Sequence, residues 1–190
     1  MSQPLSRELK EIQEELQSKN VTKKIYAIHK VISCMNMGKN VSGLFFSVIK
    51  CLEIPNAEIK KLVYLYITQH AQELPEEAIM SINSFVRDAR DKSNSLVRAM
   101  AIRTMGYLRV KELSEYLITP LLEALNDDDA YVKKTAVMVV PKLYEVNPDL
   151  IEKSGIVESL VNILKTSKNA TVVSNTIIAL NEIESKRLTN

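Results

Sequence analysis

Apolar residues recur along the chain at the spacing of α-helices. In the first segment Leu5, Leu9, Ile12 and Leu16 follow one another at intervals of four, three and four residues, so they share one helical face. The same periodicity continues in nine further segments, at residues 21–36, 41–53, 57–71, 75–90, 94–109, 112–125, 129–146, 153–165 and 169–184. The pattern predicts an all-α chain whose helices are joined by short turns.

Residues at the segment boundaries support these limits. Pro75 begins one segment, where a helix does not need the missing N–H. Asn94, Asp128 and Asn169 each come just before or at the start of a segment, and their short polar side chains can cap a first helical turn. Pro141 lies inside a segment, and we expect it to bend that helix because it lacks one backbone donor.

Every second segment repeats one pattern. An apolar residue begins it, a basic residue follows in most copies, and a small residue occupies the fifth position in the later copies. Copies begin at Ile59, Val97, Val132 and Val172, which are 38, 35 and 40 residues apart, and a fifth begins near residues 21–23. A recurring two-helix unit of this length indicates a HEAT/armadillo-like α-solenoid superhelix. The small residue would let the paired helix approach closely, and the basic residue would bond acidic or carbonyl groups of the next repeat.

Composition excludes several other classes. Gly and Pro number 4 and 6 of 190 residues, about 5% against roughly 12% in average proteins, which disfavours turn-rich β folds. The longest apolar run, Ala136–Val140, is far shorter than the ~20 residues of a membrane span. Cys34 and Cys51 both lie in apolar helical patterns, so we expect reduced packing residues of a cytosolic protein. Basic and acidic residues nearly balance, at 25 and 23, and no Trp is present; we therefore expect no nucleic-acid partner.

Candidate catalytic chemistry is sparse. The two histidines, His29 and His70, stand apart from any zinc-ligand spacing, and we expect no metal and no cofactor. The acidic run Asp127–Asp129 could hold a cation, but it precedes a helical segment whose N-terminus favours negative charge, so capping is the preferred interpretation. No motif gathers a nucleophile, a base and an oxyanion hole, and the sequence does not predict an enzyme.

Basic charge gathers in residues 19–61, which hold eight lysines against two glutamates. One interpretation is a solvated helix surface. The other is contact with anionic lipid headgroups, at ~1 kcal/mol for each basic residue near the membrane. RNA binding is the weaker third interpretation, because few aromatic residues stand between the lysines.

Four blocks of the sequence resemble the β-type large subunits of clathrin-adaptor complexes, the β-adaptins. These blocks are Met37–Phe45, Lys60–Tyr66, Val97–Gly106 and Ala130–Ala136. The resemblance covers roughly residues 20–184 in the same order and spacing, which is far more specific than a generic HEAT pattern. It implies a large-subunit scaffold in vesicle-mediated protein transport, whose trunk holds the medium and small subunits beside a second large subunit. It also implies a cytoplasmic protein, peripheral on membrane coats of the trans-Golgi, endosome or plasma membrane.

The resemblance also implies contact residues. Lys23, Lys24 and Lys30 occupy the region where family members touch phosphoinositide headgroups. Ile79 and Ile82 match the positions where some members bind an Arf-family GTPase. A helical wheel that treats residues 78–89 as one helix places Ile79 at the margin of the apolar stripe, Met80 outside it and Ile82 within it, so packing is the competing interpretation for Ile82. Clathrin binding is expected only through regions beyond this chain, because no acidic-leucine clathrin box occurs in it. The alternative function is a HEAT-repeat scaffold outside vesicle coats, either karyopherin-like or regulatory.

The last segment, residues 169–184, is as apolar as the inner ones. A terminal repeat should carry a polar outer face, so we expect the natural protein to continue and residues 1–190 to form the N-terminal part of an adaptin trunk. We further expect Ile177, Leu180 and Ile183 to form an exposed apolar edge that promotes self-association.

Overall fold

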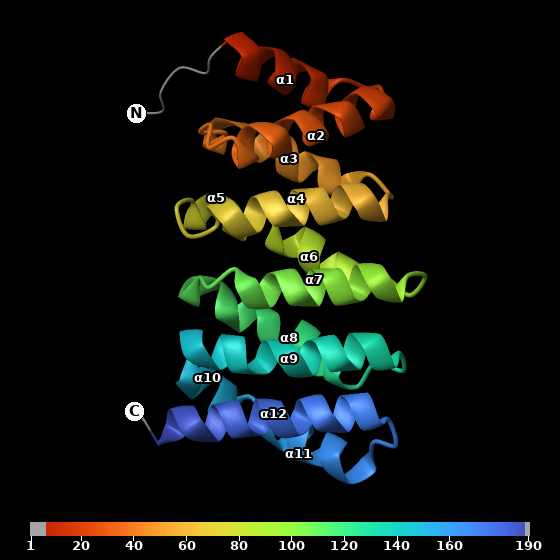
Figure 1. The fold of residues 1–190 in the computed structure, drawn as a ribbon, viewed down its shortest axis with the longest axis vertical. Coiled ribbons are helices and arrows are strands. Elements are labelled where there is room, and N and C mark those ends of the chain that lie inside the picture. Colours follow the sequence, from red (N-terminus) through yellow and green to blue (C-terminus); the bar gives the residue numbers. More distant parts are fainter. Residues whose placement is uncertain (1–6, 189–190) are drawn as a thin grey trace. The chain divides into compact units, whose positions relative to one another are not determined.

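The computed structural model describes residues 7–188, which contain helices and no strand (Figure 1). The chain divides into two compact units, Met1–Ser84 and Phe85–Asn190, each with its own buried core.

The first unit begins with α1 (Arg7–Gln17), which packs on α2 (Val21–Asn36), and α2 in turn packs on α4 (Ala57–His70). The predicted segment 41–53 is not one helix: α3 (Phe45–Ile49) lies between two 3₁₀ turns, η1 (Ser42–Leu44) and η2 (Lys50–Glu53). Gly43, a poor helix former, lies within the first of these turns. The unit closes with α5 (Pro75–Ile79) and the start of α6 (Ile82–Ala89).

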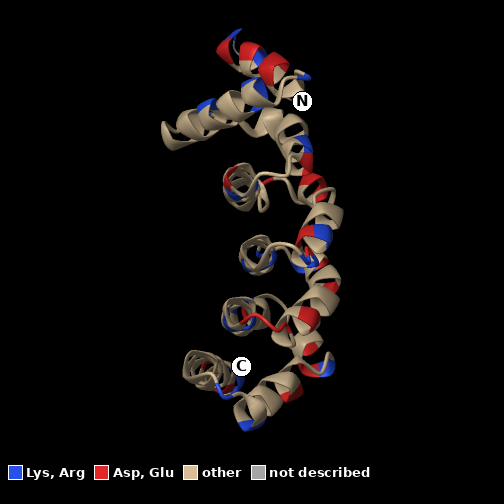
Figure 2. Cartoon of the chain, turned by 90° about the vertical axis from the view of Figure 1, so that its right-hand side faces the viewer, with Lys and Arg blue, Asp and Glu red and all other residues tan. Residues whose placement is uncertain are grey.

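The second unit is a pair of helix layers. One layer contains α7 (Ser95–Tyr107), α9 (Ala130–Val146) and α12 (Ala170–Arg187), and α9 packs against both of the others (Figures 1 and 2). The other contains η3 (Lys111–Leu113) with α8 (Ser114–Leu125), α10 (Pro148–Lys153) and α11 (Ile156–Thr166). α8 packs on α7 and α9, and α11 packs on α8 and α12. Stacked helix pairs of this kind confirm the predicted α-solenoid fold.

The helix starts follow the capping residues with one correction. Asn94 accepts hydrogen bonds from the N–H groups of Leu96 and Val97, and Asn169 accepts one from Val172. The prediction of Asp128 as a cap was wrong. Asp129 caps α9 instead, because its Oδ1 accepts from the N–H of Tyr131 at 2.8 Å.

Two prolines lie in helices where the sequence predicted them. Pro75 occupies the first turn of α5, and Pro141 lies inside α9, which continues through it.

Two helix boundaries differ from the predicted segments. The segment that was expected to run unbroken over 75–90 turns at Met80 and Ser81, where the Ser81 hydroxyl donates to the Ala78 carbonyl at 2.6 Å. The predicted segments did not include the start of α10, although Asn147 caps this helix and Pro148 begins it.

Candidate interaction surfaces

The turn between α5 and α6 presents two apolar side chains to solvent. Ile79 is 40% exposed and Met80 60% exposed, whereas Ile82 is 5% exposed. α5 has Glu76 and Glu77 in its first turn, where the helix dipole favours acidic residues. The structure therefore places Ile79 and Met80 where a partner could touch them and places Ile82 in the core, as the helical wheel predicted. GTPase contact at Ile79 and Ile82 stays a prediction.

The lysines of α2 differ in their availability. Lys30 Nζ lies 2.9 Å from both carboxylate oxygens of Glu15 and 4.5 Å from the centre of the Tyr26 ring. The hydrogen bond that Lys30 donates to Glu15 raises the pKa of Lys30. Lys23 is exposed and Lys24 half-buried, and neither forms an ion pair within residues 7–188. Of the three predicted lipid contacts, Lys23 and Lys24 remain open to an anionic ligand, and Lys30 is already bound by a carboxylate.

Glutamates of α1 neutralise part of the basic segment. Lys39 donates a hydrogen bond to Glu8 at 2.7 Å and Lys30 donates one to Glu15, so both lysines are paired with carboxylates of α1. Figure 2 shows red bands of acidic residues on α1. The lysine hydrogen bond lowers the pKa of Glu8. The charge count in the sequence did not reveal this pairing, because the partners lie 15 and 31 residues apart.

The acidic run before α9 is structural. Both Asp127 oxygens accept from Arg98, at 2.8 and 3.0 Å, while Arg98 also donates to the Asp91 carbonyl at 2.7 Å. Arg98 is the basic residue of the second repeat copy, and Asp127 precedes the helix of the next copy, so the predicted bond between repeats is present here. Hydrogen bonds from Ser95 and from the Tyr131 N–H lower the pKa of Asp129. Among the described residues no cluster of His, Cys, Asp or Glu could hold a metal ion.

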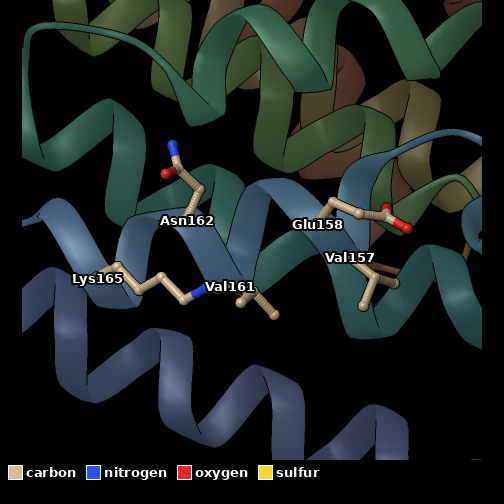
Figure 3. A pocket seen from close by; sticks show the side chains of 5 residues that line it. All are labelled: Val157, Glu158, Val161, Asn162 and Lys165. Atoms are coloured by element: carbon tan, nitrogen blue, oxygen red, sulfur yellow. The ribbon is translucent and has the colours of Figure 1, made fainter.

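Two depressions in the second unit lack converging catalytic groups. One is lined by Val157, Glu158, Val161, Asn162 and Lys165, all from α11 (Figure 3). The other includes the ion pairs of Arg98 with Asp127 and of Arg90 with Glu123. The first is lined from a single helix, and in the second Arg90 and Arg98 are already bound by carboxylates.

His70 is the one buried polar side chain without a hydrogen bond in the part of the chain that the structure describes. Its ring centre lies 4.5 Å from that of Tyr66, and its Nδ1 lies 3.8 Å from Glu73, beyond hydrogen-bond reach. Burial lowers the pKa of His70. Cys34 and Cys51 are both buried free thiols, and burial raises the pKa of each. His70 and Cys51 are packed inside the protein, and Cys34 borders a depression that Glu8 and Lys30 also line.

No helix within residues 7–188 is both long enough and apolar enough to cross a lipid bilayer.

Other proteins share the fold. A designed armadillo repeat protein in complex with the peptide (KR)4 superposes with a TM-score of 0.68 over 92% of this chain and 81% of that one, at 19% identity. A homology model of the full-length AP-3 complex in an intermediate open conformation gives 0.64 over 90% of this chain and 28% of that one, at 22% identity. At such identities the likeness is one of fold.

Sequence comparison is more specific. The model of the adaptin N-terminal region matches residues 3–190. The AP-1 complex subunit beta of Dictyostelium discoideum is 47% identical over 93% of this chain, and the AP-1 complex subunit beta-1 of Homo sapiens is 46% identical over 93%. The AP-2 complex subunit beta of Schizosaccharomyces pombe is 34% identical over 87%. The chain spans 19%, 18% and 24% of the lengths of these three relatives.

These matches confirm the resemblance that the four sequence blocks indicated. The helical layers, the repeated inner helices and a family match that runs over nearly every residue all agree: the chain belongs to the adaptin N-terminal region family, with β subunits of AP-1 complexes among its relatives.

Proposed function

We propose that the chain is a scaffold in an adaptor complex that serves vesicle-mediated transport, and that it works by binding and not by catalysis. The observation that carries this proposal is the 46–47% identity to AP-1 beta subunits, spread over 93% of the chain. The family match disfavours a karyopherin-like or regulatory scaffold outside coats, with which this chain would share only the helical fold. We propose the medium and small subunits and a second large subunit as partners, and contact with clathrin only through regions outside residues 1–190.

Co-expression tests the scaffold. The 190-residue chain should co-purify with at least one of the other three AP-1 subunits from the same source, and a helical repeat protein of similar size outside this family should not. Elution of the chain alone, with every other subunit present and folded, would contradict the proposal.

We also propose that Lys23 and Lys24 contact phosphoinositide headgroups on a membrane. Both lie on α2 without a carboxylate partner, and each would contribute ~1 kcal/mol near an anionic surface. Changing both to Glu should weaken binding to phosphoinositide vesicles roughly thirtyfold, with a steep dependence on salt. Lys61→Glu, an exposed change on α4 in the same unit, is the control. Equal losses in the control and the double variant would indicate general charge attraction instead of a site.

For an Arf-family GTPase we propose Ile79 as the contact residue, together with Met80. Their exposure supports this, whereas Ile82 has little surface to offer. The variants that separate contact from packing are described in the Discussion.

A further inference from the structure

The inner helices of the second unit, α7 and α9, expose matching stripes. Val97 and Val132 begin the repeat in these helices and are both buried. Counted from them, the exposed positions fall one residue before and six residues after: Leu96 and Arg103 on α7, Tyr131 and Met138 on α9. α7 also exposes Tyr107.

The two stripes lie on one surface. α7 and α9 pack side by side, and α8 packs against both from the second layer (Figures 1 and 2). A β-carbon on Gly106 would lie 2.4 Å from a Val139 methyl group, so the two backbones approach closely. Because α8 packs behind both helices, the exposed residues of α7 and α9 lie on sides that α8 does not cover. We define the inner face as Leu96, Arg103, Tyr107, Tyr131, Lys134 and Met138.

The inner face is apolar to an unusual degree for an exposed surface. Leu96, Tyr107, Tyr131 and Met138 are each between 41% and 49% exposed. Adjacent exposed apolar side chains of this size mark interaction sites, because their exposure to water is unfavourable. Tyr, Met and Arg are also residue types enriched in protein interfaces.

The charge on the inner face is positive and lacks a partner. Arg103 is exposed and forms no ion pair within residues 7–188. Lys134 Nζ lies 5.6 Å from the Tyr131 ring, without a carboxylate. Other cations of this unit differ: Arg90, Arg98 and Arg187 are each held by a carboxylate at 2.6–2.8 Å.

Two carboxylates near the ends of α9 are already engaged. Asp129 accepts the first N–H groups of α9 as its cap, and Glu145 lies 2.8 Å from Lys186 and 3.8 Å from Lys142. The two cations of the inner face can therefore take an anionic group from another molecule.

We propose that the inner face binds an acidic peptide segment that also carries apolar side chains, supplied by another protein. The carboxylates would bond Arg103 and Lys134, and the apolar side chains would cover Tyr107, Tyr131 and Met138. A lipid headgroup fits less well, because it offers anionic oxygens to Arg103 and Lys134 but no apolar side chain to cover the exposed Tyr107, Tyr131 and Met138. The inference stands apart from the proposed scaffold function and does not depend on it.

The length of the inner face determines the length of the peptide that should be used to test it. Leu96 and Tyr107 are eleven residues apart on one helix, about 16 Å at ~1.5 Å per residue. An extended peptide covers that distance with about five residues at ~3.3 Å each. The probe is a fluorescein-labelled peptide of about eight residues with Glu and Phe in equal numbers, and its binding to the 190-residue chain is followed by fluorescence anisotropy. Two companion peptides carry Gln or Lys in place of Glu.

We expect the Glu peptide to bind at least about tenfold more tightly than the Gln peptide, and the Lys peptide to bind most weakly. The double variant Arg103→Glu with Lys134→Glu should weaken binding of the Glu peptide by roughly tenfold or more and remove its salt dependence. Met138→Gln tests the apolar part and should weaken it severalfold. Lys165→Glu, an exposed change on α11, is the matched control and should leave binding within about twofold.

Several results would overturn the proposal. Equal binding of the Glu and Gln peptides, an unchanged double variant, or an equal loss in Lys165→Glu would each do so. Thermal unfolding shows whether each variant is folded. As a measurement that needs no variant, a Glu peptide carrying a photo-crosslinker should label α7 and α9; labelling confined to α8 or α11 would place the site elsewhere. Binding to anionic vesicles that disappears in the double variant, without peptide binding, would assign the inner face to a membrane instead.

Discussion

Gly106 is a residue at which α7 and α9 approach closely. A β-carbon there would lie 2.4 Å from Val139 Cγ1 and 3.0 Å from Cγ2, far inside normal contact distance. Two effects of Gly106→Ala oppose each other. Helix propensity favours Ala by ~1 kcal/mol, but overpacking against a stiff β-branched side chain costs roughly 1–3 kcal/mol.

We therefore expect Gly106→Ala to lower the free energy of unfolding by up to about 2 kcal/mol in urea denaturation. In a Val139→Ala background the same change should cost less or become stabilising, because the two clashing methyl groups are gone. An equal cost in both backgrounds would mean that the contact with Val139 is not the cause.

His70 makes the stability of the protein sensitive to mild acid. Burial lowers the pKa of His70 below its usual value, so the folded chain favours the neutral imidazole. Above the unfolded pKa of ~6.5 this group has no effect on the free energy of unfolding. As the pH falls below that value the unfolded chain binds the proton first, and stability is lost until the folded pKa is reached.

In His70→Phe the free energy of unfolding should therefore decrease less than in wild type as the pH falls from about 7 to about 5. Most carboxylates titrate below this pH range. His29→Gln, on the exposed histidine of α2, is the matched control and should keep the wild-type slope. Identical slopes in wild type and His70→Phe would refute this role.

At the scale of elements, two bidentate ion pairs differ in burial and should differ in strength. Arg98 and Asp127 are 16% and 13% exposed, whereas Arg90 and Glu123 are 50% and 48% exposed. Arg98→Met leaves the Asp127 carboxylate buried without its cation, which should cost about 3–5 kcal/mol. Arg90→Met removes a solvent-screened pair and should cost about 0–1 kcal/mol. Urea denaturation of both variants measures their losses of unfolding free energy. Similar losses would show that burial does not determine how much each ion pair contributes to stability.

At the turn between α5 and α6, Ile79 is exposed and Ile82 is buried, so variants of the two residues distinguish a contact surface from core packing. Ile82→Asp would place a charge in the core and should lower stability by several kcal/mol, roughly 3–5, whereas Ile79→Asp should change it by less than about 1. If the turn binds a GTPase, Ile79→Asp should reduce pull-down by GTP-loaded Arf at an unchanged melting temperature. Normal pull-down by both Ile79→Asp and Met80→Asp would remove the turn as a site.

At the scale of the whole molecule, the face of α12 that points away from α9 decides how the 190-residue chain behaves in solution. Ile177 is 47% exposed and Leu180 half-buried, and Val161 of α11 is 38% exposed. The prediction that Ile183 belongs to this edge was wrong, because it is 1% exposed and packs within the unit.

We expect weak self-association of the 190-residue chain through this edge, seen as a molar mass that rises with concentration in sedimentation equilibrium. Ile177→Glu should reduce it, and Tyr116→Glu, on an exposed residue of α8, should not. A monomer at every concentration would contradict the expectation.

The sequence by itself determined the helices, several of their ends and the repeat. Apolar spacing within a helix and capping by Asn94 or Asn169 act between residues a few positions apart, so the local sequence contains the information. The recurrence of Val97 and Val132 then gave the solenoid fold. Where local signals were finely balanced, as between Asp128 and Asp129, the expected cap was displaced by one residue.

The tertiary structure decided which of those residues are exposed to solvent and which are buried or paired. Ile102, Val137 and Ile177 hold the same place in three repeats, yet they are 1%, 0% and 47% exposed. Likewise Lys23 and Lys30 are both lysines of α2, but within residues 7–188 only Lys30 of the two forms an ion pair, with Glu15 of α1. Exposure and pairing depend on which distant segment packs against a residue, and no local pattern contains that information. The inner face, which takes Arg103 from α7 and Met138 from α9, exists only once these two helices pack together.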